Sequence, residues 1–542
     1  MEWQAITIGD GSAWAFFNGD WADGEEGALR VPDACLRQDG PAMQGHHYAF
    51  FRGATYSDLQ ARFWIRLMPH SDAGLIFRAA DASHFYLLHV PNCGQASRAQ
   101  HFWAALSLMD ESGYLRLLKM EMVRRVPSNV PIRLEVEARV QGDEVSVRIG
   151  EHGIFRASDA TRRQAGCVGA YLFGSAEIGG LAVEGQATRP KAGWSGEPRR
   201  NWFHPCPDSD YGQWQRPGDL IWTPAGDLLL AYSVQTVPHT GTVTHLTARS
   251  VDKGRTWSKP TRLDVPADDE WQSPRFHVFP DGRLKMLVRQ GDGFLLFETE
   301  DDGRTWCSPL PVEMGPNPPG IERLYVPPQS PINLSDGTTL LFLYAAHASG
   351  MKHTGERPTV RTWGATHCQC FSCRSEDGGR SWSPPVNLDN PGLRPDGTAY
   401  DGNLDLTEAG GVETGDGRIL ALIRPIYSPW MWETWSSDGG TSWGPCVRGP
   451  FPGYAAPNML RTASGTILVA HRLPGLTIHT SLDDGRTWDE GAMIDSAVWA
   501  MGSMVEVEPN VVLYVYFDSF ESLMRGQFIR VTPKGLEPAT DW

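Results

Sequence analysis

An eight-residue pattern, Ser/Thr-x-Asp-x-Gly-x-Ser/Thr-Trp, occurs five times in the second half of this 542-residue chain. The copies begin at Ser250, Thr299, Ser375, Ser436 and Ser481. In each copy the Asp can accept hydrogen bonds from the backbone of its own turn, the Gly supplies a position with positive φ, and the Trp can bury a large ring. The copies lie roughly 45 to 75 residues apart, which is typical of repeats with several strands each, so the pattern predicts β-sheets arranged around one axis.

A second recurring feature, a short turn between apolar strands, gives the number of repeats. Short turns flanked by apolar strands occur six times and are typical of β-hairpin tips, at Gly226, Gly282, Gly337, Gly417, Gly465 and Asn510. Six hairpins with five octapeptides predict a six-bladed β-propeller whose last blade lacks the octapeptide. Each blade is expected to contain four strands, with the octapeptide as the turn between the third and the fourth.

The first third of the chain has a different residue pattern. Residues 1–186 lack the octapeptide and contain runs, such as 58–67 and 131–140, in which apolar and polar residues alternate. This alternation is typical of a β-sandwich. The order of the runs resembles the concanavalin/laminin-G-like jelly rolls attached to many carbohydrate-active enzymes, which implies either a spacer packed on the propeller or a carbohydrate-binding domain.

The predicted fold class is therefore all-β, with a six-bladed β-propeller preceded by a β-sandwich (jelly-roll) domain. Residues 187–201 are rich in Gly, Pro and basic side chains and poor in strand formers, so they are predicted to be a linker. The propeller then occupies residues 202–542.

Charge and hydropathy exclude several functions. The formal net charge of −16 disfavours nucleic acid as a partner, because a phosphate-binding surface needs a basic excess. No apolar run approaches the ~20 residues of a transmembrane helix. The first residues lack the pattern of a signal peptide, which leaves a cytoplasmic location or a trimmed secreted protein. Three clustered cysteines at 368–373 are more typical of buried thiols than of a zinc site, so no metal or cofactor is predicted. The oligomeric state is left open.

Propeller geometry sorts candidate residues by face. The start of every first strand and the end of every second strand share one face, and the octapeptides lie on the other, so their aspartates are predicted to be structural. Seven residues past a hairpin glycine the chain repeatedly places a large polar side chain, at Arg289, Tyr344, Arg424 and Arg472. Ahead of the hairpins come Arg216, Arg275 and Glu408. Such arginines repel one another in a partly desolvated site unless an anion binds or neighbouring carboxylates and carbonyls satisfy them.

Three segments resemble the sialidase superfamily. The stretch RPGDLIWTPAGDLLLAY from Arg216 is similar to the first-blade motif, in which an arginine opens an R-I-P segment. EAGGVETGDGRILALIR places Glu408 sixteen residues before Arg424, which is similar to the family's pairing of the catalytic glutamate with the second arginine, and HRLPGLTIHTSLDDGRTW places Arg472 where the third arginine stands. With the octapeptides, the resemblance covers residues 200–542 and implies a clamp of Arg216, Arg424 and Arg472 for a substrate carboxylate.

Two catalytic positions depart from the family's pattern. The connection 233–244, where the family's acid/base aspartate belongs, contains no carboxylate, and His239 or Thr240 stands there. Ahead of the last hairpin, Ala500 or Met501 stands where the family has its nucleophilic tyrosine. Glu408 is thus predicted as the general base or electrostatic partner, and the other candidate catalytic residues are His239, Asp401 and Asp405.

The function predicted is an exo-acting glycoside hydrolase on an anionic terminal sugar, sialic-acid-like or uronic, with a non-standard acid and nucleophile. If water attacks directly, Glu408 and either Asp401 or Asp405 need to lie ~6.5–9.5 Å apart. The alternatives are a polysaccharide lyase on uronates, with His239 or a tyrosine moving the proton, and a non-catalytic glycan-binding propeller. A glycan is the predicted partner in each case. Long loops and aromatic rings on the same face add further candidate substrate-binding residues, His347, Tyr427, Trp430 and Trp499.

Overall fold

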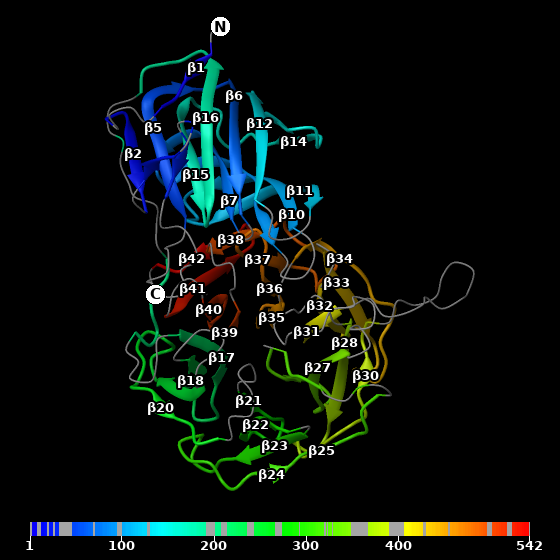
Figure 1. Cartoon of the computed structure of the whole chain (residues 1–542). Helices are drawn as coiled ribbons and strands as arrows, with labels where there is room; N and C mark the ends of the chain where they lie inside the picture. Colours follow the sequence, from blue (N-terminus) through cyan, green and yellow to red (C-terminus); the bar gives the residue numbers. More distant parts are fainter. Residues whose placement is uncertain are drawn as a thin grey trace, which may run out of the picture.

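The fold consists of β-strands. A computed structural model describes residues 3–7, 12–18, 21–24, 26, 28–31, 46–68, 71–94, 100–126, 131–190, 194, 201–207, 214–235, 243–265, 274–291, 293–318, 321, 324–327, 329–347, 367–389, 406–425, 430–453, 456–495, 501–517 and 523–540. The regular elements of these residues are strands β1–β42, with the first sixteen grouped above the rest (Figure 1). Nowhere in this described part is there a helix long and apolar enough to cross a membrane.

The N-terminal strands form two sheets. The first has the order β14-β13-β12-β6-β16-β4-β3, with β1 also paired to β16. Its strands are β1 (Gln4–Ala5), β3 (Ala22–Asp23), β4 (Leu29–Arg30), β6 (Leu59–Leu67), β12 (Ile132–Gln141), β13 (Glu144–Ile149), β14 (Ile154–Ser158) and β16 (Ala176–Gly185). The second sheet begins β2-β5-β15-β7-β8-β10-β11, with β9 paired to β10. Its N-terminal strands are β2 (Trp14–Phe17), β5 (His47–Tyr56), β7 (Asp72–Asp81), β8 (His84–His89), β9 (Asn92–Gly94), β10 (Gln100–Met109), β11 (Leu115–Val126) and β15 (Gly166–Phe173).

The two sheets pack face to face, because strand alternation gives each an apolar inner face. In β12, Leu134, Val136 and Ala138 are buried while the residues between them are exposed, and the buried set shares one core with Leu75 and Leu88 of the second sheet. The central strands β7 and β15 of the second sheet are buried on both faces. A β-sandwich is therefore present, and its assignment as a concanavalin-like jelly roll stays a prediction.

The remaining strands form a β-propeller arrangement. Among the described residues, five separate four-stranded antiparallel sheets follow the chain order. They are β17 (Trp214–Trp222), β18 (Leu228–Gln235), β19 (Val243–Ser250) and β20 (Thr261–Arg262); β21 (Arg275–Val278), β22 (Leu284–Gln290), β23 (Gly293–Glu298) and β24 (Leu310–Pro311); β26 (Ile332–Asn333), β27 (Thr339–His347), β28 (His367–Ser375) and β30 (Val386–Asn387); β31 (Leu406–Glu413), β32 (Ile419–Pro425), β33 (Trp430–Ser436) and β34 (Val447–Pro452); and β39 (Gly502–Glu508), β40 (Val511–Phe517), β41 (Met524–Thr532) and β42 (Gly535–Pro538). A short parallel pair joins β25 (Glu313–Met314) to β29 (Ser381–Trp382).

The prediction of six separate blades is wrong, because five blades are independent sheets. The other four strands, β35 (Asn458–Arg461), β36 (Ile467–Arg472), β37 (Leu476–Ser481) and β38 (Ala492–Asp495), belong to a twelve-stranded sheet that continues into the N-terminal sandwich. The physical reason is backbone pairing between β38 and β11, in which Leu115 lies opposite Met493 and Leu117 N donates to Gly491 O at 2.9 Å. The sequence showed the hairpin at Gly465 but not this added partner strand.

Contacts between innermost strands close the ring. Trp222 Nε1 on β17 donates to Glu506 O on β39 at 2.9 Å, which joins the first and last sheets. His277 on β21 contacts Asn333 on β26 at 2.7 Å. Strand β35 lies against both β31 and β39. The first strands of the sheets therefore lie side by side around one axis.

The octapeptides form the turns that the sequence predicted. In the copy at Ser250, Thr256 N and Ser250 Oγ donate to Asp252 Oδ1 at 2.8 and 2.7 Å, and Gly254 N donates to Ser250 Oγ at 2.7 Å. The same three bonds recur in the four other copies. Each octapeptide starts where a third strand ends, and that end pairs with the start of the second strand, as Ser250 does with Leu228. The turns thus lie at the strand ends opposite those that carry the arginines.

Candidate active site

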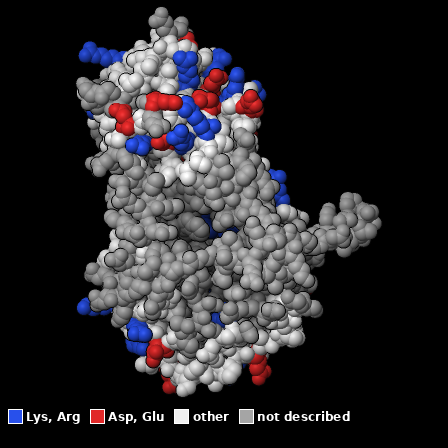
Figure 2. All heavy atoms as spheres, viewed as in Figure 1, with Lys and Arg blue, Asp and Glu red and all other residues white. Residues whose placement is uncertain are grey.

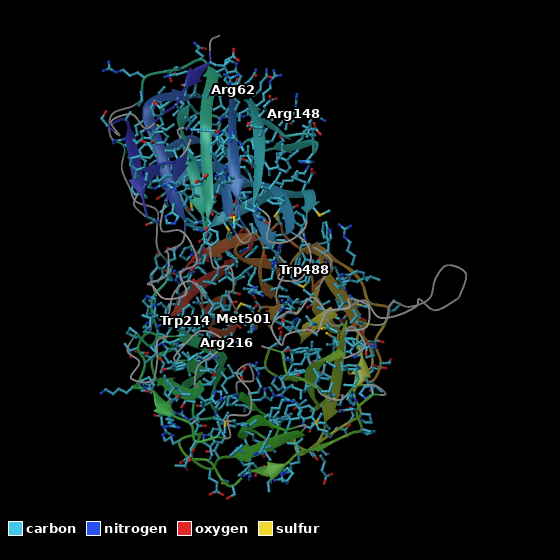
Figure 3. All side chains as sticks on the ribbon, viewed as in Figure 1. Arg62, Arg148, Trp214, Arg216, Trp488 and Met501 are labelled. Atoms are coloured by element: carbon cyan, nitrogen blue, oxygen red, sulfur yellow. The ribbon has the colours of Figure 1, made fainter. Side chains whose placement is uncertain are left out.

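One end of the propeller strands carries most of the predicted site residues. Arg216 and Glu408 lie near the starts of first strands, and Arg275 begins one. Arg424 and Arg472 lie at the ends of second strands. Figure 3 places Arg216 and Met501 near the middle of the ring, and Figure 2 shows atoms of basic side chains inside a hollow there. We call Arg216, Arg275, Arg289, Arg424, Arg472 and Glu408 the central cluster.

Glu408 lies on a β-bulge of β31. The pairing of β31 with β32 shifts register between Thr407 and Ala409, so Glu408 is the extra residue, and its φ is +54°. A left-handed backbone at a residue other than Gly costs about 1–3 kcal/mol and is typical of functional sites. The Glu408 carboxylate is buried and forms an ion pair with Arg424 Nη1. The bulge therefore holds a carboxylate against an arginine at the centre of the ring.

Arg216 on β17 is partly exposed and lies among charged neighbours. Burial, together with the positive charge of Arg275, lowers the pKa of its guanidinium from the usual 12.5 to about 10. Glu408 and Tyr344 oppose this shift, so all three groups act on the same guanidinium. A second anion beside Arg216 would raise this pKa again by stabilising the charged form.

Tyr344 is an uncharged hydroxyl beside this cluster. Burial raises the pKa of Tyr344 well above its usual value, the charge of Glu408 raises it further, and Arg424 opposes the shift. The ring stacks on Tyr325 with centroids 5.4 Å apart, and Arg289 Cζ lies 4.9 Å from the Tyr325 centroid. Tyr325 therefore joins Arg289 to the cluster, a link that the sequence did not reveal because Tyr325 follows no repeat position.

Asp219 is a second buried carboxylate that the sequence reasoning missed. Its Oδ1 pairs with Arg275 Nη1 at 3.4 Å and accepts a hydrogen bond from Ser330 Oγ at 2.5 Å, while Oδ2 accepts from Phe276 N at 2.7 Å. These contacts fix Arg275 between β17 and β21. The available signal was a carboxylate inside an apolar strand, three residues after Arg216.

Arg472 and Trp430 lie toward the seam with the sandwich. Arg472 is buried. Burial raises the pKa of Tyr514 on β40, and the charge of Arg472 opposes this shift. Trp430 packs edge-on against Trp103 of β10, with centroids 6.2 Å apart, and Arg448 Cζ lies 3.4 Å from the Trp430 centroid. The Trp430 ring therefore packs against Trp103 and Arg448. The convergence of Arg216, Arg424 and Arg472 on one ligand stays a prediction.

Several predicted residues lie outside the described part of the chain. They are His239, Asp401, Asp405, Tyr427 and Trp499, together with Thr240 and Ala500. His347 ends β27, and only its backbone is described. The pairing of Glu408 with Asp401 or Asp405 therefore stays a prediction.

The described charges of the site favour an anion. The central cluster contains five arginines and Glu408; Glu408 pairs with Arg424, and Asp219 pairs with Arg275. Several guanidinium groups thus lie at one end of the propeller in a chain of net charge −16. Guanidinium groups bind carboxylates through two parallel hydrogen bonds, so the site has the chemistry to hold a carboxylate beside Glu408.

No protein-family model matches the chain, and no curated protein matches it. Among solved structures, it is similar to a Hadza microbial sialidase, with 16% identity and a TM-score of 0.48 over 91% of this chain and 95% of that one. It is also similar to a protein of unknown function from Dyadobacter fermentans (16% identity, TM-score 0.47, 62% of this chain and 98% of that one). A third is an ulvan lyase (13% identity, TM-score 0.40, 72% of this chain and 91% of that one). Function is therefore inferred from the side chains of this chain.

Proposed function

We propose that this protein is a sialidase-like glycoside hydrolase that acts on a carboxylate-bearing sugar at the end of a glycan. The observation that supports it is the central cluster: arginines from several propeller sheets lie at one end of the strands, together with Glu408, a buried glutamate on a strained bulge that pairs with Arg424. Like charges gathered in a partly desolvated site favour the binding of an anion there.

The arginines would bind the substrate and Glu408 would move a proton. In the proposed reaction, Arg216 and Arg424 hold the sugar carboxylate, and Arg472 completes the clamp. Glu408 takes the proton of the group that attacks the anomeric carbon, and the bond from that carbon to the leaving oxygen breaks. The leaving oxygen takes a proton from an acid, for which His239 is the sequence candidate. Asp219 acts through Arg275 and is a positioning residue.

Tyr344 favours hydrolysis over elimination. A lyase needs a base that removes the proton next to the uronate carboxylate. Burial and the charge of Glu408 raise the pKa of Tyr344, so its hydroxyl stays protonated and is disfavoured as that base. A protonated hydroxyl can instead donate a hydrogen bond to the substrate or to Glu408.

A substrate screen with product analysis tests the proposal. The full chain is incubated with glycans that end in sialic acid, in a uronic acid or in a neutral sugar, and the products are followed by NMR and by ultraviolet absorbance. We expect release of the acidic sugar without a 4,5-unsaturated product. Absorbance of an unsaturated uronate would show a lyase, and binding without turnover would show a glycan-binding propeller.

A further inference from the structure

A second basic groove lies on the sandwich, far from the central cluster. The outer face of β6, β12 and β13 encloses about 450 Å³, lined by Trp3, Arg62, Glu137, Arg139, Arg148 and Ile154 among others. Figure 3 places Arg62 and Arg148 on this outer face, and Figure 2 shows basic and acidic side chains interspersed over this part of the sandwich. The second sheet of the sandwich packs on the opposite, inner face of these strands, and its strand β11 pairs with β38 of the propeller.

Strand register brings the groove's side chains together. Arg62, Glu137 and Arg148 lie directly opposite one another on β6, β12 and β13, and Arg148 pairs in turn with Ile154 on β14. Two residues along the strands, Arg139 lies opposite both Gln60 and Ser146. Side chains directly opposite one another on one face lie ~4.5–5.5 Å apart, so two adjacent rows present three guanidinium groups within the span of a few sugar rings.

Charge and aromatic contacts point to the ligand. The groove holds three arginines and one glutamate, although the chain carries a net charge of −16. Arg62 Cζ lies 4.5 Å from the Trp3 ring centroid, and Arg148 and Glu137, 3.7 Å apart, are 61% and 62% exposed. Such an exposed pair contributes little to stability, so its arginine can be drawn to a ligand at little cost. Trp3 and Ile154 add the apolar surface that sugar rings contact.

We propose that this groove binds an acidic polysaccharide, independently of the propeller site. The shared chemistry is a repeated carboxylate or sulfate that takes two hydrogen bonds from a guanidinium. The groove would hold an internal stretch of the polymer across β6, β12 and β13, and would raise the local concentration of chain ends near the propeller.

Binding assays on the full chain test this. Titration calorimetry at fixed ionic strength would use an oligogalacturonate, which carries carboxylates alone, a heparin oligosaccharide, which also carries sulfates, and a neutral dextran. We expect binding of at least one acidic oligosaccharide and none of dextran. Binding of the oligogalacturonate would show that carboxylates are sufficient. Binding of heparin without binding of the oligogalacturonate would show that sulfates are required. Binding of phosphatidylserine vesicles in place of both acidic oligosaccharides would overturn the proposal.

Matched variants distinguish binding at the groove from non-specific attraction to basic residues elsewhere on the sandwich. We expect Arg139→Gln and Arg148→Gln each to weaken the acidic oligosaccharide by about tenfold or more. Arg133→Gln is the control, because Arg133 lies on the same strand, stacks on Trp64 at 4.2 Å and lies outside the groove. Arg424→Gln, in the propeller, should leave this binding unchanged. An equal loss in the Arg133 variant, or no loss in the groove variants, would refute the groove as the binding site.

Discussion

Replacing Arg216 by methionine should stabilise the fold and remove ligand binding at once. Lowering the pKa of Arg216 from 12.5 to about 10 corresponds to about 3 kcal/mol against the charged form in the folded protein. Because the side chain is partly exposed, we take about 2 kcal/mol. The cost exists at every pH below about 10, since the group is then charged in both states. Arg216→Met removes it, so the free energy of unfolding at pH 7 should rise by up to about 2 kcal/mol.

The same substitution should weaken an acidic ligand. Loss of a charge-assisted partner costs roughly 2–5 kcal/mol of binding, which is about 30-fold to several thousandfold in Kd. Denaturant unfolding and calorimetry with a sialic-acid-like sugar measure the two effects. Arg418→Met is the control, because Arg418 pairs with exposed Asp416 at a hairpin tip. If Arg216→Met destabilises the protein and leaves acidic-ligand affinity at the wild-type value, the assignment of a strained, ligand-binding arginine is refuted.

Three further predictions follow from particular contacts. Glu408→Gln should lower kcat by ~10²–10⁴-fold with an unchanged circular dichroism spectrum, and near wild-type turnover would exclude Glu408 as the base. Hydrogen bonds from Thr305 lower the pKa of Asp301 to about 2 from 3.8, so its stabilising effect is present above pH 3.8 and is lost as pH falls through 2. Asp301→Asn should thus be less stable than wild type at pH 7 and should converge with it near pH 2, which acid-unfolding curves would show. Trp103→Ala should cost about 3–5 kcal/mol, because its buried ring packs against Trp430 across the seam, and a change below 1 kcal/mol would show that the sandwich does not support the propeller.

Local patterns predicted the propeller strands because each repeat carries its own signals. The hairpin glycines and the octapeptides specify turns within one sheet, and the pairing of Ser250 with Leu228 follows from them. They carry no information on whether a strand from another domain pairs with the edge of that sheet. The pairing of β38 with β11 joins residues far apart in sequence, so the turn pattern counted a sixth separate blade where the structure has a merged sheet.

The candidate site was predictable only in part. Repeat spacing located Arg424 and Glu408, because strand ends of successive blades share one face, and the structure shows their ion pair. The bulge at Glu408 could not be predicted, since it arises from the register of two strands. Spacing also cannot show what lies beside an aromatic ring: Trp430, which is predicted to contact a sugar, has Arg448 and Trp103 of the sandwich as neighbours.

The central claim is that the propeller's arginines select a carboxylate. The most direct measurement is the affinity of the full chain for a sialic-acid-like sugar and for its methyl ester, which lacks the charge and adds only one methyl group. The central cluster predicts that the acid binds at least about 30-fold more tightly than the ester, and that Arg424→Gln removes the difference. Equal affinity for the acid and the ester in the wild-type protein would contradict it.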